Sequence, residues 1–99
     1  MGSGVIVRYR TRPDAADQNA RLIEAVFAAL RERGPSDFSY SAYRLADGVS
    51  FVHIADIGAS GNPLPDLPAF AAFQRGLPAR CAEPADASQA TLVGSYAAR

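Results

Sequence analysis

Alternation of apolar and polar residues marks strands at both ends of the chain. In residues 5–10 the pattern has a period of two, so Val5, Val7 and Tyr9 share one face of the first predicted strand. Residues 89–96 show a similar pattern and form the last predicted strand. The segments between them must contain the helices and any further strands.

Two segments repeat their apolar residues at helical spacing. The first runs from about residue 15 to 33, with Asp14 placed to cap its start and Gly34-Pro35 placed to end it. In the second, Pro78 is expected to break or kink the helix near its end. The apolar stripe of this second helix consists of Leu67, Phe70, Phe73 and Leu77.

Two more strand-like runs, 38–45 and 49–57, are separated by a turn signal. Asp47-Gly48 favours a two-residue type I′ hairpin, so the runs should pair in antiparallel fashion. Counting outward from that turn gives a definite register. It sets Arg44 opposite Phe51, Ala42 opposite His53, and Tyr40 opposite Ala55.

The order of these elements is β-α-β-β-α-β, which predicts an α+β fold of the ferredoxin-like kind. We expect a four-stranded antiparallel sheet with two helices on one face. The 99 residues suffice for one hydrophobic core, so residues 5–97 are predicted to form a single domain. Residues 1–4 are expected to be a flexible leader.

Apolar side chains occur on both faces of the predicted hairpin. One face carries Tyr40, His53 and their neighbours and should meet the helices. The other carries Tyr43, Leu45, Val52 and Ile54, although a solvated sheet face is usually polar. Burial of that face against a second copy of the chain would explain the pattern, and the alternative is a semi-polar surface on a monomer.

Charge and composition limit the partners. Ten basic residues, all Arg, balance ten acidic residues, so the basic excess expected of a nucleic-acid-binding protein is missing. An RNA-recognition module shares the element order, but Val49, Ile54 and Ile6 occupy positions where such modules need stacking rings. We therefore expect no nucleic-acid partner.

A single cysteine, Cys81, rules out an internal disulfide and fits a reducing compartment. No apolar stretch approaches the roughly 20 residues needed to span a bilayer. These features predict a cytoplasmic protein with no membrane association.

The hairpin, the strand Phe51-Val52-His53-Ile54 and the closing segment Val93-Gly94-Ser95-Tyr96 together resemble the dimeric α/β-barrel superfamily. Within it the chain is most similar to the antibiotic biosynthesis monooxygenase family. The resemblance implies a homodimer in which two sheets close into a barrel, with a small pocket between sheet and helices in each subunit. Some members of this family oxygenate electron-rich aromatic molecules without metal or flavin, others degrade haem, and many have no known activity. The haem-degrading branch uses a His on the second helix together with a Trp and an Asn. This chain has no Trp and has no His between Asp66 and Cys81, so the resemblance does not extend to haem degradation.

A cofactor-independent oxygenase needs a base and polar donors on apolar walls. His53 is the only histidine and the first candidate for a base, although a lone histidine in a strand is often simply packed. Tyr40 lies diagonally near it and is a candidate to orient a substrate oxygen. Arg44 is a candidate to stabilise an anion, or else a charge at the solvent edge of the strand.

Asn62, Phe70 and Phe51 are the candidate residues for binding the substrate, a small apolar or aromatic molecule. We predict no cofactor, and no metal because His53, Asp56 and Glu83 do not have the spacing of metal ligands. The competing interpretation is a non-catalytic dimer that binds a small ligand or has a structural role.

Overall fold

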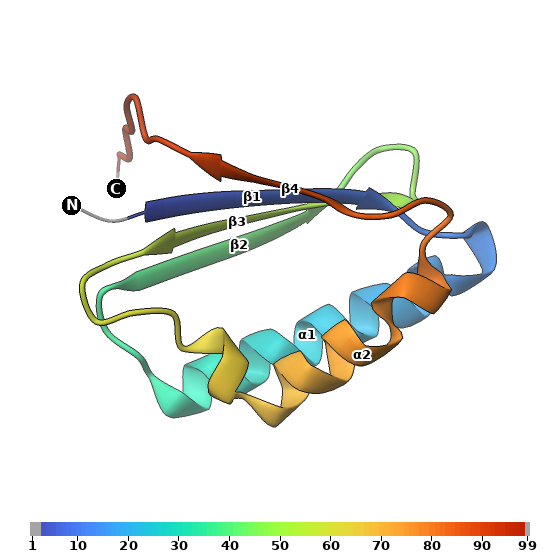
Figure 1. Cartoon of the computed structure of the whole chain (residues 1–99), viewed down its shortest axis with the longest axis horizontal. Coiled ribbons are helices and arrows are strands. Elements are labelled where there is room, and N and C mark those ends of the chain that lie inside the picture. The colour runs from blue at the N-terminus through green and yellow to red at the C-terminus, as the bar shows by residue number, and fades with distance from the viewer. Residues whose placement is uncertain (1–2, 99) are drawn as a thin grey trace.

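A computed structural model describes residues 3–98 of the chain (Figure 1). Four strands and two α-helices follow one another in the predicted order β-α-β-β-α-β, and a short 3-10 turn precedes each helix. Their bounds are β1 Ser3–Arg10, η1 Pro13–Ala15, α1 Ala16–Arg33, β2 Phe38–Arg44, β3 Ser50–Ile57, η2 Leu64–Asp66, α2 Pro68–Arg80 and β4 Asp86–Ala90.

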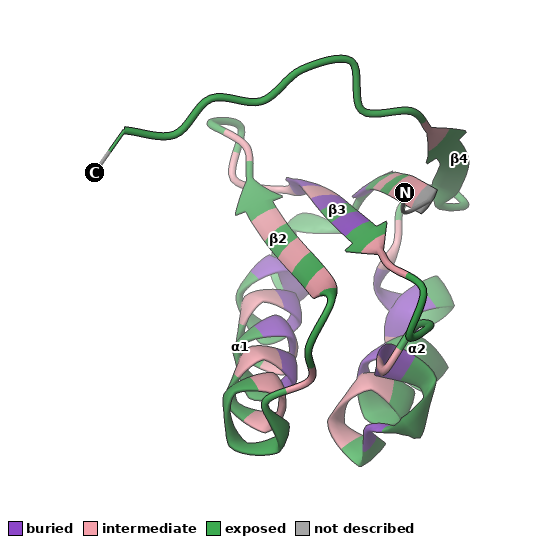
Figure 2. Ribbon diagram, turned by 90° about the vertical axis from the view of Figure 1, so that its left-hand side faces the viewer, coloured by how far each residue is buried: buried purple, intermediate pink, exposed green. Residues whose placement is uncertain are grey.

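The strands form one antiparallel sheet in the order β2-β3-β1-β4. Both helices lie on the same face of this sheet and pack against each other (Figures 1 and 2). The predicted ferredoxin-like α+β fold is therefore confirmed. Neither helix in residues 3–98 is long and apolar enough to cross a membrane.

The register predicted for the central hairpin is confirmed, but the turn type is wrong. Arg44 pairs with Phe51, and Tyr40 with Ala55, as expected. The loop, however, contains four residues, 46–49, because the Leu45 N–H bonds to the Ser50 carbonyl and the Gly48 N–H bonds back to Leu45. Only the glycine of the Asp47-Gly48 pair has a positive φ, whereas a type I′ turn needs two.

Asp47 explains the longer loop. Its carboxylate accepts hydrogen bonds from the backbone N–H groups of Val49 and Ser50 at 3.0 and 2.8 Å, and from the Ser50 hydroxyl at 2.6 Å. These bonds stabilise the loop as an Asx-type turn. The residue count outward from the turn is unchanged, so the strands keep the predicted register.

Helix α1 ends as predicted and begins differently. Gly34 has a φ of 61° and returns its N–H to the Leu30 carbonyl, the left-handed C-terminal cap expected of glycine. Asp14 is not the N-terminal cap, because the η1 turn intervenes before the helix. Its carboxylate accepts hydrogen bonds from the Arg12 guanidinium instead, at 3.0 Å.

Pro78 lies inside α2 and does not end it, since the helix continues to Arg80. The position falls in the last turn of the helix. The Cys81 N–H still bonds to the Leu77 carbonyl across that turn. The last turn of α2 therefore keeps its helical conformation despite the proline.

The bounds of the first and last strands differ from those predicted. β1 begins at Ser3, so Ser3 and Gly4 belong to the sheet, and residues 1 and 2 of the expected leader lie outside the described residues. β4 covers Asp86–Ala90 instead of 89–96, which makes the predicted bounds wrong. Its last pair is Ala90 with Gly4 of β1.

The core lies between the sheet and the helices. It is built from Tyr9 and Phe51 of the sheet together with apolar residues of both helices, of η2 and of the junction between η2 and α2, namely Ala16, Ile23, Val26, Leu64, Leu67, Phe73 and Leu77. On the opposite face, Tyr43 is 55% exposed, and Ile6 and Ile54 are also exposed. The outer face of the sheet is thus partly apolar, as the sequence predicted.

Candidate functional site

A cavity of about 320 Å³ lies between the inner face of the sheet and the α2 side of the molecule. Its walls are mostly aliphatic and aromatic, which suits a small apolar ligand. Seven lining residues come from η2, α2 and the loop before them, namely Asn62, Leu64, Pro65, Phe70, Phe73, Gln74 and Leu77. The other seven come from strands β1, β2 and β3 and are Val5, Val7, Tyr9, Tyr40, His53, Ala55 and Ile57.

Three neighbouring strands each contribute one hydrogen-bonding side chain to this cavity. His53 of β3 lies between Tyr9 of β1 and Tyr40 of β2. The Tyr9 hydroxyl is 2.8 Å from Nε2 of His53, and the Tyr40 hydroxyl is 2.6 Å from Nδ1. Both ring nitrogens of the only histidine are therefore hydrogen-bonded to phenols.

The hydrogen bonds continue behind Tyr9 into the helices. Asn19 of α1 donates from Nδ2 to the Tyr9 hydroxyl at 2.9 Å. Arg80 of α2 donates from Nε to Oδ1 of Asn19 at 2.9 Å and from Nη2 to the Phe73 carbonyl at 2.8 Å. A continuous chain of five side chains thus runs from Arg80 through Asn19, Tyr9 and His53 to Tyr40. We call it the relay.

Burial determines the protonation of the relay. Desolvation lowers the pKa of His53 from its ordinary value of 6.5 to about 4, so the imidazole is neutral at pH 7. Desolvation also raises the pKa of Tyr40 to about 12. It raises the pKa of Tyr9 well above its ordinary value, although the hydrogen bond from Asn19 acts in the opposite direction. Both phenols therefore keep their protons at neutral pH.

Four residues predicted as site residues do line the cavity. Tyr40 and His53 lie at its polar end, and Phe70 and Asn62 lie on the α2 side. The side-chain oxygen of Asn62 accepts a hydrogen bond from the Leu64 N–H at 3.0 Å, which fixes the start of η2. The diagonal approach of Tyr40 to His53 follows from the register of the hairpin.

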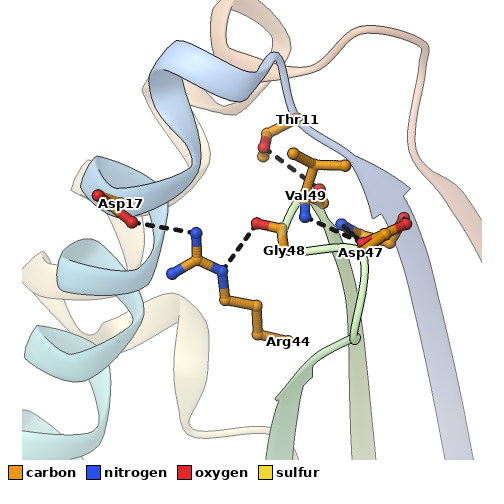
Figure 3. Close-up of polar contacts among 7 residues, drawn as sticks. Thr11, Asp17, Arg44, Asp47, Gly48 and Val49 are labelled. Carbon is orange, nitrogen blue, oxygen red and sulfur yellow. Dashed lines mark hydrogen bonds and ion pairs between the residues drawn. The ribbon is translucent and has the colours of Figure 1, made fainter.

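Two predicted site residues, Arg44 and Phe51, lie away from the cavity. Arg44 donates from Nε to the Gly48 carbonyl at 2.8 Å and from Nη2 to the Asp17 carboxylate at 3.0 Å, at the solvent edge of the hairpin (Figure 3). Phe51 is buried in the core and stacks on Tyr9, with ring centroids 5.5 Å apart. Neither residue lines the cavity.

Tyr9, Asn19 and Arg80 were not predicted from the sequence as functional residues. The sequence pattern places Tyr9 only on the same face of its strand as Val5 and Val7. Asn19 precedes Ile23 and Val26 at helical spacing, and Arg80 follows Phe73 and Leu77 in the same way. A polar residue within the apolar stripe of each helix was therefore the available signal.

The site has no cluster of metal-binding side chains. Within residues 3–98, no three or more His, Cys, Asp or Glu side chains lie close enough together to hold a metal ion.

Comparison with known proteins identifies the fold. No protein-family model matches the sequence, and no curated protein matches it. Among solved structures, Rv0793 from Mycobacterium tuberculosis is 19% identical with a TM-score of 0.74, and the alignment covers 98% of this chain and 100% of that one.

Two further similar structures have a described activity. A variant of SnoaB, a cofactor-independent oxygenase from Streptomyces nogalater, is 15% identical with a TM-score of 0.69, covering 95% of each chain. An antibiotic biosynthesis monooxygenase is also 15% identical with a TM-score of 0.69, covering 93% of this chain and 99% of that one. This chain therefore has the fold of antibiotic biosynthesis monooxygenase-like proteins, the class that the sequence resembled. At these identities the similarity concerns the fold alone.

Proposed function

We propose that this protein is a cofactor-independent oxygenase that acts on a small aromatic or enolisable molecule in the cavity. The observation that carries the proposal is a phenol–imidazole–phenol cluster in a cavity whose other walls are mostly apolar. The oxygenase activity of a protein with the same fold supports it. The substrate ring would lie against Phe70 and the aliphatic walls, with its oxygen at Tyr40.

The reaction can balance without a separate reductant. The substrate loses a proton, and the resulting enolate or phenolate passes an electron to dioxygen. The carbon radical and superoxide combine, and the peroxide formed loses water to leave a carbonyl group. Overall, a CH₂ group and O₂ give a C=O group and water, so the substrate supplies all the electrons.

Tyr40, supported by His53, is the residue that we assign to the substrate oxygen. His53 itself is a poor proton acceptor near neutral pH, because its pKa is about 4 and both of its nitrogens are already hydrogen-bonded. We therefore propose that the substrate binds as the anion that it forms in solution. The role of the site is then to stabilise that anion in an apolar environment where dioxygen can react with it.

We further propose that the active form is a homodimer joined through the outer face of the sheet. Ile6, Tyr43 and Ile54 expose apolar area there, and Val52 lies half-buried beside Tyr43. Exposed apolar patches on a sheet face are typical of interfaces. Residues 91–98 follow β4 and expose Leu92, Val93 and Tyr96, which adds apolar surface available to a partner.

A non-catalytic ligand-binding protein is the second candidate. The observation in its favour is the same low pKa of His53, since the site then contains no free base at neutral pH. Such a protein would bind aromatic molecules in the cavity without turnover.

Oxygen consumption distinguishes the two functions. Purified chain would be dialysed against a chelator and assayed with an oxygen electrode against a panel of anthrones and quinols. The oxygenase proposal expects one dioxygen consumed per ketone formed, and loss of that activity in His53→Gln. Tight binding of the same compounds with no oxygen uptake above the buffer rate would instead support the binding protein.

A further inference from the structure

We infer that Arg80 and Asn19 are positioning residues that fix the direction of every hydrogen bond in the relay, so that Tyr40 presents a hydrogen-bond donor to the cavity. The site would then select ligands with an acceptor oxygen, above all an enolate or phenolate. The assignment of direction stands on the geometry of the free protein. Only its consequence for the ligand rests on the proposed function.

The direction is set first at Arg80. A guanidinium group can only donate hydrogen bonds, so the Asn19 atom that faces Arg80 at 2.9 Å must be the amide oxygen. The amide nitrogen of Asn19 is then turned toward Tyr9, 2.9 Å away, and donates to its hydroxyl. Arg80 thereby removes the ambiguity between the two ends of the Asn19 amide.

The second step is at Tyr9. Its oxygen accepts from Asn19, and its own hydrogen still needs an acceptor, because the side chain is buried. Among the hydrogen bonds of the described residues, the only other partner of this hydroxyl is Nε2 of His53, at 2.8 Å. Tyr9 therefore donates to Nε2, and that nitrogen carries no hydrogen.

The third step is at His53. A neutral imidazole has one N–H group, and with Nε2 acting as acceptor that hydrogen must be on Nδ1. Nδ1 then donates to the Tyr40 oxygen across 2.6 Å. The hydroxyl hydrogen of Tyr40 is left free to point into the cavity that Tyr40 lines.

Burial of the Arg80 charge is energetically unfavourable, which supports a specific role for this residue. Arg80 is only 5% exposed, and its charge has no carboxylate partner in the described part of the chain. A buried cation without a counter-ion is unfavourable. The glycine one turn earlier leaves room for the guanidinium in its present position, because a Cβ at Gly76 would lie 2.6 Å from Nη1 of Arg80.

A cation at the far end of the relay favours an anion at the near end. Hydrogen bonds in a chain polarise one another, so donation by Arg80 strengthens each successive donor up to Tyr40. An anionic oxygen beside Tyr40 would receive a stronger hydrogen bond than it would from an isolated phenol. A ligand that can only donate would leave the Tyr40 hydrogen without a partner.

The test is the tautomer of His53, read from the nitrogen chemical shifts of the ring by NMR. The chain has one histidine, so both nitrogen signals belong to His53, and their couplings to the carbon-bound ring hydrogens distinguish Nδ1 from Nε2. In the wild-type protein at pH 7 we expect the protonated-nitrogen shift at Nδ1 and the unprotonated shift at Nε2. The reverse pattern, or an even mixture, would overturn the inference.

Asn19→Asp is the decisive variant, because it preserves size and the Arg80 contact while reversing the direction. A carboxylate at position 19 can only accept, so Tyr9 would donate to it, and His53 would donate from Nε2 to Tyr9. We expect the tautomer to switch in Asn19→Asp and to remain on Nδ1 in Arg80→Lys, which keeps a donor. A purely structural role predicts altered stability but an unchanged tautomer in both variants.

Titration with 4-nitrophenol tests the consequence for the ligand. The wild-type protein should bind the yellow phenolate in preference to the neutral phenol. Asn19→Asp should weaken phenolate binding by roughly tenfold or more. Absence of phenolate binding, or equal affinities in the two proteins, would contradict selection of an acceptor oxygen. Because the tautomer and the titration need no turnover, these results are independent of whether the oxygenase activity is found.

Discussion

The Tyr40 hydroxyl lies 2.6 Å from Nδ1 of His53, although the two residues are not directly paired across the sheet. Tyr40 pairs with Ala55 and His53 pairs with Ala42, so the two side chains meet on the diagonal of the β2–β3 ladder. Small alanine side chains at both paired positions leave room for this approach. The register of one hairpin thus assembles the polar end of the cavity.

Stability should depend on pH through His53. Its pKa is about 4 in the folded chain and about 6.5 when the residue is unfolded and solvated. Between these values the unfolded state binds a proton that the folded state excludes, so stability falls as the pH falls from 6.5 to 4. The expected slope is about 1.4 kcal/mol per pH unit.

Urea unfolding at pH 7, 6 and 5 for wild type and His53→Gln would measure that slope. Carboxylate titrations are common to both proteins, so the difference between them isolates the histidine. Parallel pH dependence in the two proteins would contradict a neutral, desolvated His53.

Gly76→Ala tests the packing of Arg80. Replacing a glycine inside a helix by alanine normally stabilises a protein by about 1 kcal/mol. Here the new Cβ would lie 2.6 Å from Nη1 of Arg80, so the guanidinium must move away from its present contacts. We expect stability that is unchanged or lower, measured by urea unfolding.

Ala72→Gly is the matched control for that variant. Ala72 is an exposed residue of the same helix, so its replacement should cost about 1 kcal/mol through helix propensity alone. If Gly76→Ala increased the stability by as much as Ala72→Gly decreased it, the position of the Arg80 guanidinium would not depend on the glycine.

Tyr43→Glu tests the proposed dimer interface. The side chain is 55% exposed in a single chain, so a charge there should leave the fold of the monomer intact. We expect light scattering to give a dimer mass for wild type and a monomer mass for the variant. Gln18→Glu, on the exposed side of α1, should remain a dimer. A wild-type monomer at all concentrations would refute the interface.

Asp47→Asn tests the hairpin loop. Hydrogen bonds from Ser50 and Val49 hold the pKa of the Asp47 carboxyl below its ordinary value, so its ionised form stabilises the fold. That contribution is present at neutral pH and is lost as the pH falls through the lowered pKa. The melting temperature of the variant should be lower than that of wild type at pH 7, and the difference should shrink in acid. A constant difference would assign the effect to something other than the charge.

Much of this architecture was predictable because it follows from local patterns. The period-two alternation of the hairpin and the Asp47-Gly48 signal together predict the pairing of Arg44 with Phe51 that the sheet contains. The same register places His53 and Tyr40 on one face of the sheet, so their proximity follows from the sequence alone. The left-handed cap at Gly34 follows equally from sequence.

The rest depends on contacts that the sequence does not display. Asn19 and Arg80 are 61 residues apart and meet only because α1 and α2 pack side by side. β4 ends at Ala90, opposite Gly4 of β1, and the composition of residues 89–96 does not reveal which of them pair with that strand. Arg44 was a plausible anion ligand by charge alone, whereas its partner Asp17 comes from a helix distant in sequence.

Oxygen uptake by wild type, Tyr40→Phe and Arg44→Ala, with one anthrone substrate and a chelator present, is the most direct test of the proposed site. We expect Tyr40→Phe, which removes only the hydroxyl at the polar end of the cavity, to lose most of the activity. We expect Arg44→Ala, at the solvent edge, to retain it. Retained activity in Tyr40→Phe together with loss in Arg44→Ala would contradict a reaction centred on Tyr40 and His53.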